Sequence, residues 1–332
     1  MPHPVGKDIP RVPSYEITGL NITNVSVPGS DHQAIRGDVV AQTKNPWPIE
    51  LVVPLLGFEV LAPNCEVDDE AILVADATTN PFVVHPESDV SLSASGIIRH
   101  LPEMLTQECA NTGTSPLDRV LDKYLHGEAA TFYVRGRGLA DTPQWIVDIM
   151  SQVTFPVDFP GHSSNHIVRN FSVVDLEFQL PGPIEDPNDA DDGKVLISGT
   201  VEVFAALPPE MRFDVKVTGM RASAELFYQS RKLGKMHLDE WQSANSTRVG
   251  LADASEILLK IISHVKDVPL EITDGDVFAD VIEKLLFGNK DVVLNMQASV
   301  DGAVETVLGE LIIKGIPTEG SVLVKRPLKP LS

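Results

Sequence analysis

The sequence predicts an α+β protein, mainly β with helices, built as two tandem β-sandwich modules. Three observations lead to this prediction. Segments of alternating apolar and polar residues recur along the chain, which is the period of half-buried strands. Two further stretches have apolar residues at helical spacing. Both kinds of segment return in the same order about 162 residues later, which indicates an internal duplication.

The strands of the two copies match in register. Each copy begins with an expected strand, Tyr15–Val27 in the first and His166–Leu180 in the second. Ile35–Ala41 then corresponds to Ile197–Val203, with apolar or small residues at the same alternating positions. A second pair of alternating segments follows at the same offset, Leu51–Gly57 and Phe213–Gly219. Alternation of this type favours antiparallel sheets packed on a second layer.

A helix follows the early strands in each copy. Leu117–Leu125 and Phe278–Leu286 have apolar residues at i, i+3, i+4, i+7 and i+8, which places one apolar stripe toward a core. Gly127 and Gly288 stand where a C-terminal cap is expected. The β-rich runs Ala130–Val134 and Asp291–Leu294 come next, followed by helix-like segments, Trp145–Gln152 and Thr306–Ile313. The dipeptides Phe155-Pro156 and Ile316-Pro317 complete the correspondence.

These matches define the expected domains. Residues 1–13 form an N-terminal tail, 14–163 the first module, 164–326 the second module and 327–332 a C-terminal tail. The second module contains an Asp-rich loop, 181–194, with Pro-Gly-Pro at its start, and we expect this loop to be solvated.

Composition excludes several classes of protein. The 332 residues are 43% hydrophobic, which suffices for about two domains with cores. The net charge of −21 and the lack of clustered Lys and Arg exclude a nucleic-acid-binding surface. No uncharged apolar stretch approaches the roughly 18 residues of a membrane span, so the chain as written is expected to be soluble.

One motif resembles a known family of domains. Lys44-Asn45-Pro46-Trp47-Pro48 lies between two expected strands. This order resembles the Asn-Pro hallmark of group-2 late-embryogenesis-abundant domains, which are immunoglobulin-like sandwiches. The second copy has Leu207-Pro208 at the corresponding place, so the hallmark is degenerate there.

The opening segment Pro10–Ile22, the tandem arrangement and the helix-glycine-strand element resemble one fungal group. These are vacuolar membrane proteins that terminate autophagy, often labelled pre-rRNA processing proteins, and the resemblance covers about residues 8–326. Family members carry a membrane anchor ahead of tandem luminal domains, and this chain has none. The resemblance therefore implies the luminal C-terminal part, on the luminal side of the vacuole membrane. It also implies a non-enzymatic interaction or sensing region with a protein partner.

Four acceptor sequons for N-glycosylation fit a luminal location. They begin at Asn21, Asn24, Asn170 and Asn245. Asn21 and Asn24 are too close together for both to be modified. Whether any of the four is glycosylated stays open.

Cys65 and Cys109 are 44 positions apart in the first module. In an oxidising lumen they would pair and destabilise the unfolded chain by about 4 kcal/mol. In a cytosolic protein they would be free thiols. Neither lies in a Cys-x-x-Cys pattern, which argues against a redox or zinc role.

No motif predicts a catalytic, cofactor or metal site. His162 and His166 lie in a Gly- and Ser-rich linker, and the tract Asn188–Gly193 fails the EF-hand pattern because Ala190 and Gly199 fall at ligand positions. Nucleophile elbows, phosphate loops and dinucleotide fingerprints are missing. We therefore expect a protein that is not an enzyme. The alternative is a lipid- or apolar-ligand-binding module, in which the two helical stripes line a groove.

Overall fold

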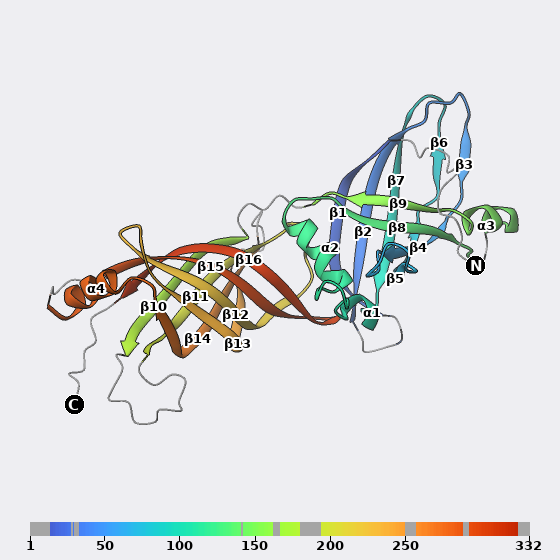
Figure 1. Ribbon diagram of the computed structural model, residues 1–332. Coiled ribbons are helices and arrows are strands. Elements are labelled where there is room, and N and C mark those ends of the chain that lie inside the picture. Colours follow the sequence, from blue (N-terminus) through green and yellow to red (C-terminus); the bar gives the residue numbers. More distant parts are fainter. Residues whose placement is uncertain are drawn as a thin grey trace. The chain divides into compact units, whose positions relative to one another are not determined.

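The computed structural model describes residues 14–27, 29, 33–140, 142–161, 167–179, 194–249, 257–287 and 292–324. In this part of the chain the fold is mainly β with short helices, as the sequence predicts (Figure 1). The chain divides into two compact units. Unit 1 comprises Met1–Ser164, Glu210–Asp214 and Thr306–Gly309, and unit 2 comprises Asn165–Pro209, Val215–Glu305 and Glu310–Ser332.

Unit 1 contains a seven-stranded sheet in the order β1-β2-β7-β5-β4-β8-β9 and a separate two-stranded sheet of β3 and β6. The strands are β1 (Tyr15–Ser26), β2 (Gln33–Lys44), β3 (Leu51–Val53), β4 (Gly57–Ala62), β5 (Ile72–Thr79), β6 (Phe82–Val84), β7 (Asp89–Ile98), β8 (Ala130–Arg137) and β9 (Thr154–Phe159). All pairs in both sheets are antiparallel.

The helices of unit 1 are α1 (Glu103–Thr106), α2 (Pro116–Leu125) and α3 (Gln144–Met150). Helix α2 begins with a capping box, in which Ser115 and Asp118 satisfy each other's backbone N–H groups. It ends as the sequence predicts. Gly127 has φ +77° and its N–H donates to the Tyr124 carbonyl, while Glu128 N donates to Lys123 O. This is the Schellman pattern, which requires a residue that tolerates positive φ.

Unit 2 is a closed barrel in the order β10-β11-β14-β13-β12-β15-β16 (Figure 1). Its elements are β10 (Val168–Gln179), β11 (Val195–Leu207), β12 (Val215–Tyr228), β13 (Arg231–Val249), β14 (Ile257–Ile272), α4 (Gly275–Phe287), β15 (Val292–Thr306) and β16 (Gly309–Val324). The barrel closes where β10 pairs with β16 in parallel, for example Val173 with Val322. Gly320 permits this approach, because a Cβ atom there would lie 2.5 Å from the Phe171 ring.

Helix α4 lies at one end of the barrel strands and contributes to their core (Figure 1). Val277, Val281 and Leu285 are buried among the inward side chains of the barrel. The Asp274 carboxylate caps the helix by accepting the N–H groups of Asp276 and Val277, each at 3.1 Å. Lys284 Nζ donates to the Tyr228 hydroxyl at 2.7 Å and to Asp280, and both bonds raise the pKa of Lys284.

The structure differs from the sequence prediction in two respects. The strands of unit 2 close into one barrel, whereas the prediction was a sandwich of two facing sheets. Alternation along a strand fixes which side chains face inward but does not fix which strands pair at the edges. The segment Thr306–Ile313 is also not a helix, because Val307 and Leu308 form the turn between β15 and β16. The corresponding segment of the first copy, Trp145–Gln152, does contain helix α3.

The two units have the same strand order. The seven strands of the larger sheet in unit 1 can be matched in chain order to β10 to β16 of unit 2. With this matching, the order of neighbouring strands is the same in both sheets, from β1 to β9 and from β10 to β16. The main helix also occupies the same place, α2 between β7 and β8 and α4 between β14 and β15. This common topology supports the predicted duplication, which itself stays a prediction. The immunoglobulin-like assignment stays a prediction for unit 1 and does not fit the closed barrel of unit 2.

Candidate functional site

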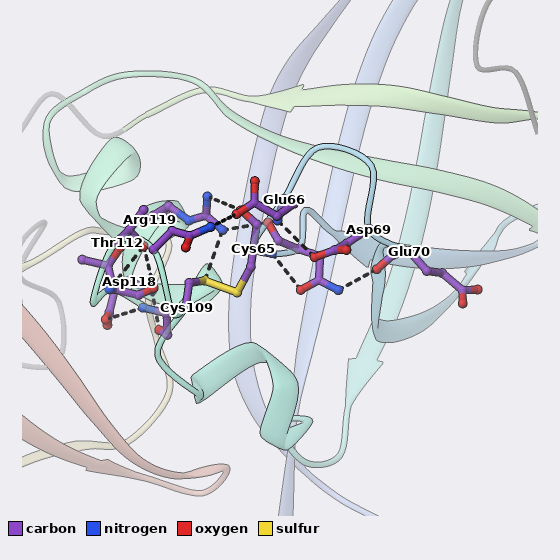
Figure 2. The surroundings of a disulfide bond; sticks show 12 residues. Cys65, Glu66, Asp69, Glu70, Cys109, Thr112, Asp118 and Arg119 are labelled. Atoms are coloured by element: carbon purple, nitrogen blue, oxygen red, sulfur yellow. Dashed lines mark hydrogen bonds between the residues drawn. A yellow bond between two sulfur atoms is a disulfide. The ribbon is translucent and has the colours of Figure 1, made fainter. Parts of the chain in front are cut away.

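Cys65 and Cys109 form a disulfide in unit 1 (Figure 2). Their Cα atoms are 5.5 Å apart. Cys65 lies in the loop after β4, and Cys109 lies in the segment between α1 and α2, so the bond fastens the helical segment to the sheet. Both cysteines of the chain are used, and no free thiol is left for redox or nucleophilic chemistry.

Arg119 on α2 reinforces this junction. Its guanidinium donates to the backbone carbonyls of Asn64, at 2.7 Å, and Cys65, at 3.2 Å, and it lies 3.6 Å from the Cys109 sulfur. Figure 2 shows Arg119 alongside the sulfur–sulfur bond. A cation in such a position binds both sides of the cross-link at once. Nothing in the sequence pattern marked Arg119, because a single Arg on a helix has no distinguishing spacing.

The loops on either side of the disulfide are held by local hydrogen bonds. Cys109 accepts the N–H groups of Thr112 and Gly113 at its carbonyl, which closes a tight turn. On the other side, Asn111 Nδ2 donates to the Glu66 carboxylate at 2.8 Å, which joins the two loops directly. The two loops beside the disulfide are therefore held by hydrogen bonds as well as by the covalent bond, and the role of this region is structural.

The sequons differ in exposure. Asn170 on β10 and Asn245 on β13 are exposed on unit 2. Asn21 and Asn24 lie half-buried on β1. The Asn24 amide nitrogen donates to Asp214 at 2.8 Å, and its Oδ1 is buried without a partner in the described part of the chain. A glycan requires free space at the amide nitrogen, so Asn170 and Asn245 have the more suitable geometry.

Asn45, the residue of the Asn-Pro motif, is a buried anchor in unit 1 with 5% exposure. Its Nδ2 donates to the carbonyls of His85, at 2.8 Å, and Ile49, at 3.3 Å, while its Oδ1 accepts the Trp47 N–H at 3.1 Å. These bonds fix the bend at which the chain leaves β2 and enters β3. Sequence reasoning used Asn45 only as a family hallmark and did not predict this role.

Beyond this anchor, unit 1 exposes a group of apolar side chains on the loop 45–50 and the β3–β6 sheet. We call it the apolar ribbon surface. Trp47 is 54% exposed and Val52 is 69% exposed. Its members are Trp47, Ile49, Leu51, Val52 and Val83. Isolated exposed apolar residues are ordinary, but here several lie on one small element.

The two predicted helical stripes lie in cores. Val281 and Leu285 of α4 belong to the barrel core, and Phe278 and Ile282 pack against it. Leu117 of α2 packs against the smaller core of Ala62, Ile72 and Leu105. These positions favour core packing over the lining of a groove. The alternative of a lipid- or apolar-ligand-binding module thus gains no support from the stripes, and it stays a prediction.

The described residues contain no group of three or more His, Cys, Asp or Glu side chains that could hold a metal ion. The His162–His166 linker, the acidic tract up to Gly193, Gly288 and the two tails lie outside the described residues. Within the described ranges, none of the helices combines the length and the apolar character that crossing a bilayer requires.

Comparison with known proteins gives a partial match. Residues 211–325 match the family described as the Tag1 C-terminal domain. The chain is also 21% identical, over 290 residues, to an uncharacterized protein of Saccharomyces cerevisiae. That alignment covers 82% of this chain but 46% of the yeast protein, so the chain spans about half the length of the relative it matches.

Solved structures add little. An anti-sigma factor domain-containing protein from Clostridium clariflavum aligns over 92% of this chain and 91% of its own, with 8% identity and a TM-score of 0.14. The B domain of a biofilm associated protein aligns over 92% and 85%, with 7% identity and a TM-score of 0.14. Scores this low carry no argument about fold or function. The chain is therefore similar, in its C-terminal part, to the Tag1 C-terminal domain and, over most of its length, to a fungal protein.

Proposed function

We propose that the chain is a non-enzymatic interaction or sensing region in the lumen of the vacuole, where it takes part in the termination of autophagy. The main support for a luminal location is the Cys65–Cys109 disulfide. Disulfides persist in oxidising compartments and are rare in the cytosol. The match to the Tag1 C-terminal domain and the similarity to a yeast protein support the resemblance to a fungal family, from which the proposed compartment and role are taken.

The compartment is tested by expressing the chain, within its natural gene product, in the fungal host. We expect a mass shift that is sensitive to endoglycosidase and is lost in the Asn170→Gln/Asn245→Gln variant. We also expect both cysteines to resist alkylation until a reductant is added. A cytosolic protein with unmodified asparagines and reactive thiols would contradict the luminal assignment.

The interaction role has its support in the apolar ribbon surface, where we expect a protein partner to bind. Val52→Glu places a charge at a position that is 69% exposed, so the fold tolerates it while apolar contact is lost. Val67→Glu is the matched control, because Val67 is fully exposed at another place in unit 1.

Both variants are introduced at the natural locus, and the duration of autophagy during prolonged starvation is measured. We expect Val52→Glu to prolong autophagy, and Val67→Glu to behave as the wild type. Normal termination in the Val52→Glu strain, at normal protein abundance, would contradict a role for this surface.

A further inference from the structure

The barrel wall of unit 2 contains a shallow cleft of about 540 Å³ that none of the sequence motifs predicts. It lies where the end of β12 meets β15 and β16. Its side chains come from Phe227, Ser230, Asn295, Gln297, Glu319 and Ser321. The volume is within the range of about 300–1,000 Å³ that is typical of small-molecule sites.

Strand alternation explains why polar side chains gather here. On β15, Leu294 and Met296 point into the barrel core, so Asn295 and Gln297 point outward. On β16, Val322 points inward and Ser321 outward. The turn from β12 to β13 forms one rim, with Gln229 and Ser230 both at positive φ. Positive φ at both central residues is the conformation of a tight hairpin turn, and it brings Ser230 to the edge of the cleft.

The polar groups form two cross-strand pairs. Gln297 Nε2 lies 3.5 Å from the Glu319 carboxylate, and Ser321 Oγ donates to Asn295 Oδ1 at 3.2 Å. Within the described part of the chain, the Asn295 amide nitrogen and the Gln297 amide oxygen have no hydrogen-bond partner. The cleft thus presents a free donor and a free acceptor on neighbouring amide groups, beside one carboxylate.

The charges exclude two kinds of ligand. Among the residues that the structure describes, none that lines the cleft is a Lys or Arg. The nearest cations in sequence, Arg231 and Lys232, are engaged in ion pairs with Asp274, at 2.9 Å, and Glu225, at 2.5 Å. An anionic ligand would find no counter-charge among these described lining residues. A purely apolar ligand would remove water from two amides and a carboxylate. The hydrogen bonds that these groups make to water would be lost, and the ligand would offer none in their place.

We propose that this cleft binds a neutral polyhydroxylated ligand, that is, a glycan. Each sugar hydroxyl both donates and accepts, so adjacent hydroxyls match the free donor of Asn295 and the free acceptor of Gln297. The half-buried Phe227 ring offers an apolar surface to the C–H face of a sugar ring. This inference does not depend on the proposed compartment or on the role in autophagy.

Saturation-transfer NMR on the full chain tests the proposal. The probes are cellobiose, α-1,2-mannobiose and N,N′-diacetylchitobiose, together with a high-mannose glycopeptide and the same peptide without its glycan. We expect saturation of sugar ring protons in at least one probe. Transfer to a free disaccharide identifies a soluble sugar as a ligand, whereas transfer to the glycopeptide alone identifies a protein-linked glycan. Both outcomes support the proposal.

The site is tested by variants at exposed or half-buried positions outside the barrel core. Asn295→Ala/Gln297→Ala should reduce the saturation transfer from the protein to the sugar at least tenfold. Phe227→Leu should weaken the transfer to the protons on the C–H face of the sugar ring. Gln242→Ala, on β13 away from the cleft, is the matched control and should leave the signal unchanged. Circular dichroism verifies that each variant is folded. Absence of transfer to every sugar, or transfer that persists in the folded double variant, would overturn the proposal.

Discussion

Reduction of the Cys65–Cys109 disulfide should destabilise unit 1 strongly and selectively. The bond closes a loop between residues 44 positions apart. Opening it releases conformational entropy in the unfolded chain, because the two segments no longer have to stay together. The folded state changes less, since Arg119 still binds the backbone carbonyls on the Cys65 side.

The magnitude follows from the size of the loop. For a loop of this length, the chain-entropy relation gives a loss of about 4 kcal/mol at 25 °C. A urea m-value of about 2 kcal/mol/M converts this loss into a fall of about 2 M in the unfolding midpoint. A domain of ordinary stability, about 5–15 kcal/mol, would lose a large fraction of its free energy of unfolding.

The assay is urea denaturation, with and without dithiothreitol. Hydrogen exchange detected by mass spectrometry monitors the unfolding of each unit. Peptides from β4, β5 and α2 report on unit 1. Peptides from β12 and β14 serve as an internal control, because the closed loop lies wholly within unit 1. The Cys65→Ala/Cys109→Ala variant repeats the measurement without a reductant.

A midpoint shift in unit 1 below about 0.5 M, equivalent to about 1 kcal/mol, would refute the reasoning. It would mean that the cross-link restrains the unfolded chain far less than a 44-residue loop should. A shift of equal size in the unit 2 peptides would refute the selectivity, since no part of the loop belongs to the barrel.

Three further predictions concern single side chains. Asn45→Ala should lower the free energy of unfolding of unit 1 by about 2–4 kcal/mol, because three hydrogen bonds to a buried amide are lost; urea denaturation should show almost no change for the exposed control Asn80→Ala. Leu285→Ala should cost about 2–5 kcal/mol through a cavity in the barrel core, and thermal melting should leave Glu283→Ala, on the outer face of α4, unchanged. The hydrogen bond from the Val277 N–H, followed by that from Arg231, lowers the pKa of Asp274. Its stabilising effect is therefore fully present above the unfolded pKa of about 3.9 and is lost as the pH falls through the lower folded pKa. Asp274→Asn should flatten the dependence of the melting temperature on pH below pH 4, and an unchanged slope would argue against this capping role.

The helices show what sequence patterns can establish. Val281 and Leu285 were predicted to face a core from their spacing, and both are buried. Gly127 was predicted as a helix cap, and its positive φ confirms it. Such features depend on neighbours within a few residues, and local patterns record them well.

Features that depend on distant partners could not be predicted. The β10–β16 pairing joins Val173 to Val322, and nothing local at either residue identifies the other. The apolar run after Thr306 fits a helix or a strand equally well by periodicity. The structure shows a turn in which Thr306 Oγ1 accepts the Leu308 N–H and Gly309 takes φ +116°, and these features favour the hairpin.

The candidate sites divide in the same way. Cys65 and Cys109 were named from the sequence, but whether they pair depends on a distance of 5.5 Å between Cα atoms that no spacing encodes. Arg119 and the cleft residues Asn295 and Gln297 were missed altogether. Each is an ordinary polar residue in its own segment and acquires a role only through a neighbour from another strand or loop.

The two units share one strand order but differ in the path of the chain after the second strand. In unit 1, Asn45 bends the chain out of β2 and into the short β3, and the strands that follow, β4 and β5, have 6 and 8 residues. At the corresponding place of the predicted duplication, unit 2 has Leu207, which cannot make these bonds, and its strands β12 and β13 have 14 and 19 residues. In unit 2, the long strands form a closed barrel whose outer wall carries polar side chains. In unit 1, the chain after Asn45 forms the loop and the short β3 strand that contain most of the apolar ribbon surface. We therefore expect the two units to bind different kinds of partner, an apolar protein surface at unit 1 and a polar ligand at unit 2.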